Sequence, residues 1–134
     1  MTNKVKRILI ADDDPDDIEM LVEAFARLGE QLTIDTVRNG EEVLKYLDGR
    51  SAEDLPGVII LDYKMPILDG AEVLDKLKAQ ERYTRIPRII WSTSGQEEDM
   101  KRCIHNGARR YFIKPARVNE LELMARQMLG YCIS

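Results

Sequence analysis

Short apolar runs, separated by longer segments of mixed polarity, recur along the whole chain. Four of them are nearly continuous in apolar character and rich in β-branched or aromatic residues: Ile8–Ala11, Val58–Leu61, Ile89–Trp91 and Tyr111–Ile113. Continuous apolarity over so few residues is typical of parallel strands that helices cover on both faces. The segment Leu32–Val37 alternates between apolar and polar residues, which predicts a strand nearer an edge of the sheet.

Segments with helical periodicity lie between the predicted strands. Pro15 stands at a first-turn position and Gly29 follows the first segment, as is typical of the two ends of a helix. This alternation predicts a doubly wound α/β fold with right-handed crossovers. No repeat or linker interrupts it, so we expect a single domain over residues 1–134 with no output domain. The periodic segments are Ile18–Leu28, Val43–Leu47, Val73–Leu77, Met100–Ile104 and Leu121–Leu129.

The composition narrows the class of protein. Of the 134 residues, 44% are hydrophobic and 33% are charged, a balance typical of globular domains. The formal net charge of -4 disfavours binding to nucleic acid, which needs a basic surface. No apolar run approaches the ~18 residues of a membrane helix, and the N-terminus lacks the apolar core of a signal peptide. Cys103 and Cys132 stand outside any CxxC pattern, so we expect free thiols in a cytoplasmic protein without membrane contact.

Charged and hydroxyl side chains stand where the predicted strands end. Asp12 and Asp13 follow the first strand, and Asp62 follows the third. Ser92 and Lys114 stand at the ends of the next two strands. Because ligand sites of such sheets lie at the carboxyl ends of the strands, these groups are expected to converge. Clustered carboxylates repel one another, and Mg²⁺, a hard cation that prefers oxygen ligands, is the cofactor that best relieves that repulsion.

Together these groups favour phosphoryl transfer. A carboxylate beside Mg²⁺ can attack phosphorus and form an acyl phosphate. Asp62 stands alone at its strand end, so we predict it as the nucleophile, while the acidic pair holds the metal. Lys114 and the metal would neutralise the phosphoryl oxygens, and the Ser92 hydroxyl would donate to one of them.

The same motifs resemble the receiver domain of response regulators in two-component signalling. They agree with that family in order and spacing: the acidic pair Asp12/Asp13, the central aspartate in Leu61–Pro66, the hydroxyl of Ser92 and the pair Lys114–Pro115. The resemblance covers essentially the whole chain and implies a flavodoxin-like (βα)5 fold with strand order 2-1-3-4-5. It also implies a signalling protein that catalyses only its own phosphorylation and dephosphorylation.

The resemblance implies which residues hold the metal. Asp13 would bind Mg²⁺ directly, and Asp12 would bind it mainly through water. Asp62 would supply a third carboxylate, and the backbone carbonyl of Lys64 would complete the ligands from the protein. A sensor histidine kinase would then be the partner that supplies the phosphoryl group to Asp62.

The resemblance further implies how the phosphoryl group is held and sensed. Lys114 would pair with its oxygens, and the Lys114–Pro115 bond is expected to be cis. Ser92 would swing towards the phosphoryl group, and Tyr111 would move inward behind it. This relays the change to the surface of the fourth helix, fifth strand and fifth helix, where a second copy is expected to bind. Thr93 stands where the family commonly has Ala or Gly, which implies tighter access to the phosphoryl group.

Two kinds of output remain open for such a receiver. One is a stand-alone regulator whose phosphorylated form docks an effector or a second copy of itself. The other is a relay intermediate that passes the phosphoryl group to a histidine phosphotransfer protein. Exposed apolar side chains in the last two helices would favour docking. The segments Asp48–Pro56, Gln80–Pro87 and Trp91–Ser94 resemble those of stand-alone regulators that pair with phytochrome-type sensor kinases.

The acidic run after the first strand has two other interpretations. Asp12 and Asp14 also fit the Asp-x-Asp motif of a haloacid-dehalogenase-type phosphatase, the enzymatic alternative. That family has Thr or Val at the position of Asp16, and its core is usually longer than this chain. Asp14, Asp16 and Asp17 are interpreted as a solvated helix start, because acidic side chains stabilise a helix N-terminus. Asp12 and Asp13, directly behind a buried strand, keep the metal role.

Overall fold

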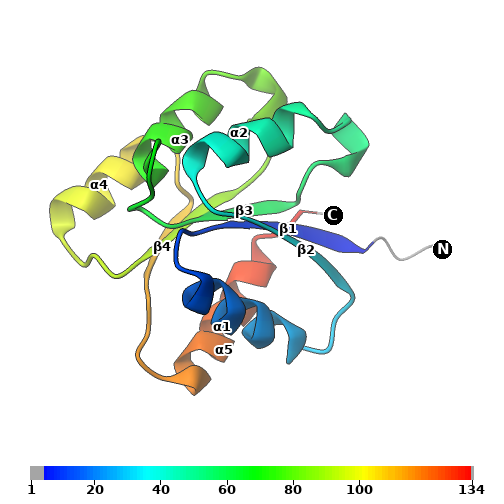
Figure 1. The fold of residues 1–134 in the computed structure, drawn as a ribbon, viewed down its shortest axis with the longest axis vertical. Coiled ribbons are helices and arrows are strands. Elements are labelled where there is room, and N and C mark those ends of the chain that lie inside the picture. The colour runs from blue at the N-terminus through cyan, green and yellow to red at the C-terminus, as the bar shows by residue number, and fades with distance from the viewer. Residues whose placement is uncertain (1–4, 134) are drawn as a thin grey trace.

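A computed structural model describes residues 5–133, in which strands and helices alternate along the chain (Figure 1). Residues 1–4 and 134, which belong to the predicted domain 1–134, lie outside the described residues. The strands are β1 Lys6–Ala11, β2 Leu32–Val37, β3 Val58–Leu61, β4 Arg88–Ser92 and β5 Arg110–Ile113. The helices are α1 Pro15–Ala26, α2 Gly40–Asp48, α3 Gly70–Lys78, α4 Glu97–His105 and α5 Val118–Gly130, with short 3-10 helices η1 Ala52–Asp54 and η2 Glu81–Tyr83.

The strands pair in parallel in the order β2-β1-β3-β4-β5, which confirms the predicted flavodoxin-like order 2-1-3-4-5. β1 lies between β2 and β3, with Ile8 opposite both Ile34 and Val58. β2 lies at the edge of the sheet, as its alternating pattern predicts. Because every pairing is parallel, the carboxyl ends of all the described strands meet at one edge.

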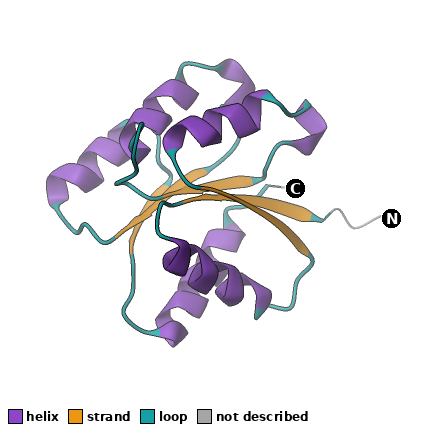
Figure 2. Ribbon diagram, in the orientation of Figure 1, coloured by secondary structure: helices purple, strands orange, loops and turns teal. Residues whose placement is uncertain are grey.

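Helices cover both faces of the sheet, as Figure 2 shows, with α2, α3 and α4 on one face and α1 and α5 on the other. Leu9 and Ile59 point into the first layer, while Ile8, Ile60 and Trp91 point into the second. All five are buried, which explains the continuous apolarity of the central strands. Within residues 5–133, no helix has the length and apolar character to cross a membrane.

Local signals fix the helix ends. The Asp14 carboxylate accepts a hydrogen bond from the Asp16 backbone N–H, and Pro15 occupies the first turn of α1. Asp69 begins α3 with a capping box, in which its side chain and that of Glu72 bond reciprocally to the backbone. The first of these caps fixes how α1 leaves the carboxyl end of β1, where the site is expected.

The chain after α5 returns to the sheet at Gly57. The Ile133 N–H donates to the Gly57 carbonyl at 2.9 Å, and the Gly57 N–H donates to the Arg7 carbonyl at 2.8 Å. A Cβ on Gly57 would lie 1.9 Å from the Ile133 carbonyl oxygen and 2.7 Å from Cys132 Sγ. Only glycine fits this contact, which joins the segment after α5 to the amino-terminal end of β3.

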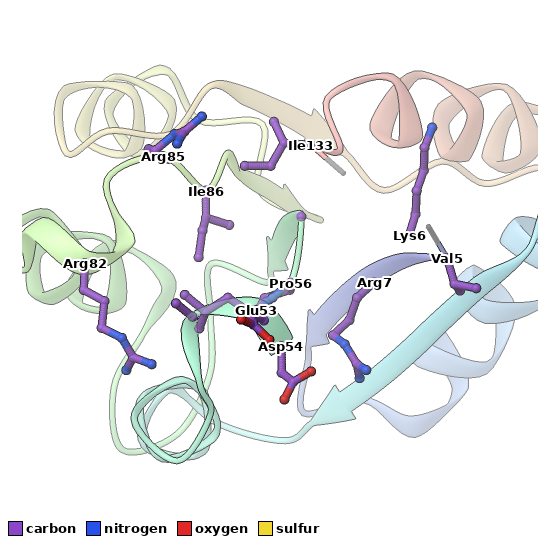
Figure 3. Close-up of a pocket in the computed structure, with 13 residues that line it drawn as sticks. Val5, Lys6, Arg7, Glu53, Asp54, Pro56, Arg82, Arg85, Ile86 and Ile133 are labelled. Atoms are coloured by element: carbon purple, nitrogen blue, oxygen red, sulfur yellow. The ribbon is translucent and has the colours of Figure 1, made fainter. Parts of the chain in front are cut away.

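A cavity of about 710 Å³ opens beside this contact (Figure 3). Arg7 on its wall donates to Asp35 of β2 at 2.9 Å, and Asp35 also accepts a hydrogen bond from Tyr46 at 2.5 Å. Arg82 donates to two backbone carbonyls. The charged residues that line the cavity carry both signs: Lys6, Arg7, Arg82, Arg85, Glu53 and Asp54. Arg7 and Arg82 are thus already hydrogen-bonded within the protein, and none of the predicted site residues lines the cavity. The candidate site therefore lies elsewhere.

Replacing Gly57 by Ala should lower the free energy of unfolding by about 1–3 kcal/mol, because the new Cβ forces Ile133 or β3 to shift. Gly130→Ala is the matched control, since its Cβ would meet nothing within 4 Å and alanine favours the helix by up to about 1 kcal/mol. Urea unfolding followed by circular dichroism measures both. A Gly57→Ala protein as stable as wild type would contradict the close contact.

Candidate functional site

The predicted carboxylates gather where β1 and β3 end. The Asp12 N–H donates to the Val37 carbonyl, and the Asp62 N–H donates to the Ala11 carbonyl, so sheet hydrogen bonds fix both backbones. Carboxylate oxygens of Asp12, Asp13 and Asp62 all lie within 4.8 Å of one another. Asp12 and Asp62 are buried, whereas Asp13 is exposed. The structure therefore brings together the three carboxylates that the sequence placed at the strand ends.

Lys114 is the cation of this cluster. Its Nζ lies 2.8 Å from Asp12, 2.8 Å from Asp17 and 3.2 Å from Asp62, and only 9% of its side chain is exposed. The backbone N–H of Lys114 donates to the Ser92 carbonyl at 2.8 Å, which fixes where the side chain begins. Lys114 thus reaches across the sheet edge from β5 and joins carboxylates that arise on three different segments.

The predicted cis bond between Lys114 and Pro115 is wrong, because the structure has no cis peptide bond among the described residues. A trans bond is the ordinary state before proline and is favoured by about 0.5–1 kcal/mol. Here the Lys114 backbone is held by Ser92, and Nζ already reaches all three carboxylates with the bond in trans. The contacts of Lys114 with Ser92 and with the three carboxylates are thus made with the bond in trans.

The interpretation of Asp17 as a solvated helix start is also wrong. Asp14 caps α1 and Asp16 is exposed, as expected of such residues, but Asp17 turns inward to pair with Lys114. The sequence holds no local signal of this pairing, because an acidic residue in the first turn is already explained by the N-terminus of the helix. The Asp14 carboxylate, in contrast, caps the helix and is not part of the cluster of Asp12, Asp13 and Asp62. The Asp-x-Asp motif of a phosphatase, which needs both Asp12 and Asp14 in the site, therefore loses its basis.

Crowding shifts the ionisation of the buried groups. Burial raises the pKa of the Asp62 carboxyl to about 7, and the charge of Asp12 adds to this rise while Lys114 opposes it. Burial disfavours the charge on Lys114, but hydrogen bonds to Asp12 and Asp17 outweigh it and raise the pKa of Lys114 above its usual value. The lysine stays protonated, yet the cluster remains short of positive charge at neutral pH.

The donor set fits a hard divalent cation. Three carboxylates from two adjacent strand ends offer oxygen ligands alone, which is the kind of site that Mg²⁺ occupies in proteins. Such a cation would also supply the positive charge that the buried carboxylates lack. The Lys64 side chain is exposed, and the role of its backbone carbonyl as a ligand stays a prediction.

A hydrogen-bonded chain of residues leads away from the end of β4. Buried Ser92 accepts a hydrogen bond from the Ser94 N–H at 3.2 Å. Tyr111 donates its hydroxyl proton to the Ser94 carbonyl at 2.8 Å and is itself buried. Ser94 also donates to Asp99 of α4 at 2.6 Å, a link that the sequence did not indicate. Tyr111 therefore already lies inward in this structure, while Thr93 is exposed.

Comparisons with known proteins agree on one family. The family model for the response regulator receiver domain matches residues 8–126. A curated relative, the probable methanogenesis regulatory protein FilR2 of Methanothrix harundinacea, is 33% identical over 129 residues, which cover 92% of this chain and 81% of that protein. The matched residues include every position of the site, from Asp12 to Lys114.

Two solved structures share the fold over nearly the full length of both chains. The phosphorylated cyanobacterial phytochrome response regulator RcpA is 30% identical with a TM-score of 0.87, and the alignment covers 98% of this chain and 96% of that one. The bacteriophytochrome response regulator AtBRR is 28% identical with a TM-score of 0.77, and the alignment covers 98% and 97% of the two chains.

Without a divalent cation, Asp62 should oppose folding as the pH rises. Because the pKa of Asp62 is raised to about 7 in the folded chain, the folded state binds more protons than the unfolded state, and stability is lost between pH 4 and 7. In EDTA, wild type should lose roughly 1–2 kcal/mol more than Asp62→Asn between pH 4.5 and pH 8. Urea unfolding at both pH values tests this, and equal losses in the two proteins would contradict it.

Proposed function

The chain belongs to the family of response-regulator receiver domains, and we propose that Asp62 accepts a phosphoryl group from a sensor histidine kinase. Receiver domains are phosphorylation-controlled modules of two-component signalling, not enzymes that act on a separate substrate. The observation that carries the proposal is the position of Asp62. This residue is buried, its carboxylate lies 3.2 Å from Lys114 Nζ, and it belongs to the cluster of three carboxylates.

The transfer forms one bond and breaks another. An Asp62 carboxylate oxygen attacks the phosphorus of a phosphohistidine, the P–N bond breaks, and the leaving imidazole nitrogen keeps the electron pair and takes up a proton. Lys114 pairs with the phosphoryl oxygens as charge builds on them. Mg²⁺, held by Asp12, Asp13, Asp62 and the Lys64 carbonyl, would supply further positive charge to those oxygens.

The switch begins at Ser92. We assign its hydroxyl a bond to the phosphoryl group, to which the O–H donates while the oxygen still accepts from the Ser94 N–H. Tyr111 holds the Ser94 carbonyl, so the loop that moves with Ser92 stays connected to β5. Thr93, next to Ser92, narrows the entrance for donors. The conformational change caused by phosphorylation of Asp62 is thereby transmitted to the start of α4.

The output that we propose is docking of a second copy through the face formed by α4, β5 and α5. Large apolar side chains are exposed there: Ile104, Ile113, Val118 and Leu123. Exposed apolar side chains on these elements support binding over transfer to a histidine phosphotransfer protein, which remains the alternative outcome. We further propose that the chain acts in the cytoplasm as a response regulator similar to RcpA and AtBRR, since the alignments cover 96% and 97% of those chains.

Intact-mass spectrometry after incubation with acetyl phosphate and Mg²⁺ tests the acceptor. Wild type should gain one phosphoryl group, and Asp62→Asn should gain none because it lacks the nucleophilic carboxylate. Asp75→Asn, which changes the same charge at an exposed position on α3, should behave as wild type. Omitting Mg²⁺ should slow the reaction by at least roughly tenfold. Modification of Asp62→Asn to the same extent as wild type would refute the assignment.

Size-exclusion chromatography with light scattering tests the docking surface. Phosphorylated wild type should elute as a dimer, and Leu123→Gln should shift the monomer–dimer equilibrium at least roughly threefold towards monomer by removing apolar contact. Leu123 is 62% exposed on α5, and Met20→Gln on α1, at 45% exposure, is the matched control outside the face. A fully phosphorylated protein that stays monomeric and passes its phosphoryl group rapidly to a histidine phosphotransfer protein would favour the relay instead.

A further inference from the structure

Asp17 is a fourth carboxylate at the site, with no role in the chemistry described so far. It lies in the first turn of α1, its side chain is 22% exposed, and one oxygen is 2.8 Å from Lys114 Nζ. It stands outside the group of Asp12, Asp13 and Asp62 whose oxygens can converge on one ion. Among residues 5–133, its side-chain partner is the lysine that the phosphoryl group also needs.

We propose that Asp17 competes with the phosphoryl group for Lys114 and so slows phosphorylation of Asp62, an inference that rests on the proposed function. A lysine ammonium has three N–H donors. In this structure three carboxylates take them, at 2.8 Å for Asp12, 2.8 Å for Asp17 and 3.2 Å for Asp62. An incoming phosphoryl oxygen must therefore displace one of these acceptors to reach the lysine.

The competitor that remains after metal binding is Asp17. Asp12 and Asp62 turn oxygens towards the cation site, where a divalent ion offsets their charge. Asp17 has no such alternative and keeps its full attraction for Lys114. Its negative charge also lies one lysine headgroup away from the place that an anionic phosphoryl group must enter, and like charges at that distance repel. Competition for Lys114 and charge repulsion therefore both slow phosphorylation of Asp62.

Asp17→Asn removes the charge and leaves the side chain nearly the same size. At saturating Mg²⁺ it should be phosphorylated by acetyl phosphate at least roughly threefold faster than wild type. Asp16→Asn is the matched control, since Asp16 has the same charge in the same helix turn but is exposed. Asp17→Glu restores a carboxylate and should return the rate towards that of wild type, which a purely structural role of residue 17 would not require.

Trp91 supplies a second readout that needs neither metal nor phosphoryl donor. Lys114 Nζ lies 4.8 Å from the centre of the Trp91 ring, and the chain has one tryptophan. Release of the lysine from Asp17 should change the emission of Trp91 in Asp17→Asn measured in EDTA, whereas Asp16→Asn should match wild type. Unfolding curves of both variants establish that they are folded.

The outcomes separate the two proposals. Faster phosphorylation of Asp17→Asn, with changed Trp91 emission and a wild-type rate for Asp16→Asn, supports competition. If wild type is phosphorylated and Asp17→Asn is phosphorylated at the same rate or more slowly, competition is overturned and the acceptor assignment stays intact. Absence of phosphorylation in every variant, wild type included, overturns the proposed function and the competition with it.

Discussion

Repulsion between carboxylates held at one sheet edge is the constraint on which the site depends. Parallel pairing of β1 and β3 places Asp12 and Asp62 side by side, and α1 adds Asp17 from above the same edge. One ammonium group, on Lys114, offsets this charge in the absence of a cation. The fold thus holds an excess of negative charge that a divalent cation relieves, and this relief is what lets an anionic phosphoryl group enter the site.

Much of the fold could be predicted because its signals are local. Strands buried on both faces leave continuous apolar runs, and caps such as Asp14 and Asp69 mark where helices begin. The site followed from the fold, since parallel strands bring their carboxyl ends together whatever the intervening sequence. Asp12, Asp13, Asp62 and Lys114 were found in this way.

What the sequence missed depends on distant neighbours. Asp17 has an adequate local explanation as an acidic residue at a helix start, and its pairing with Lys114 joins positions 97 residues apart. The link from Ser94 to Asp99 depends on how the loop after β4 meets α4. The Lys114–Pro115 bond was predicted from the family and not from the energetics of this chain, and the preference for trans prevails here.

The edge strand shows how the sheet is limited to five strands among the described residues. Asp35 of β2 is tied to Arg7 on the neighbouring strand and to the hydroxyl of Tyr46 on α2. A charged residue fixed near an open edge makes that edge a poor template for another strand, because a new neighbour would bury the ion pair. The pairing of Arg7 with Asp35 thereby protects the protein against edge-to-edge aggregation, at the side of the sheet farthest from β5.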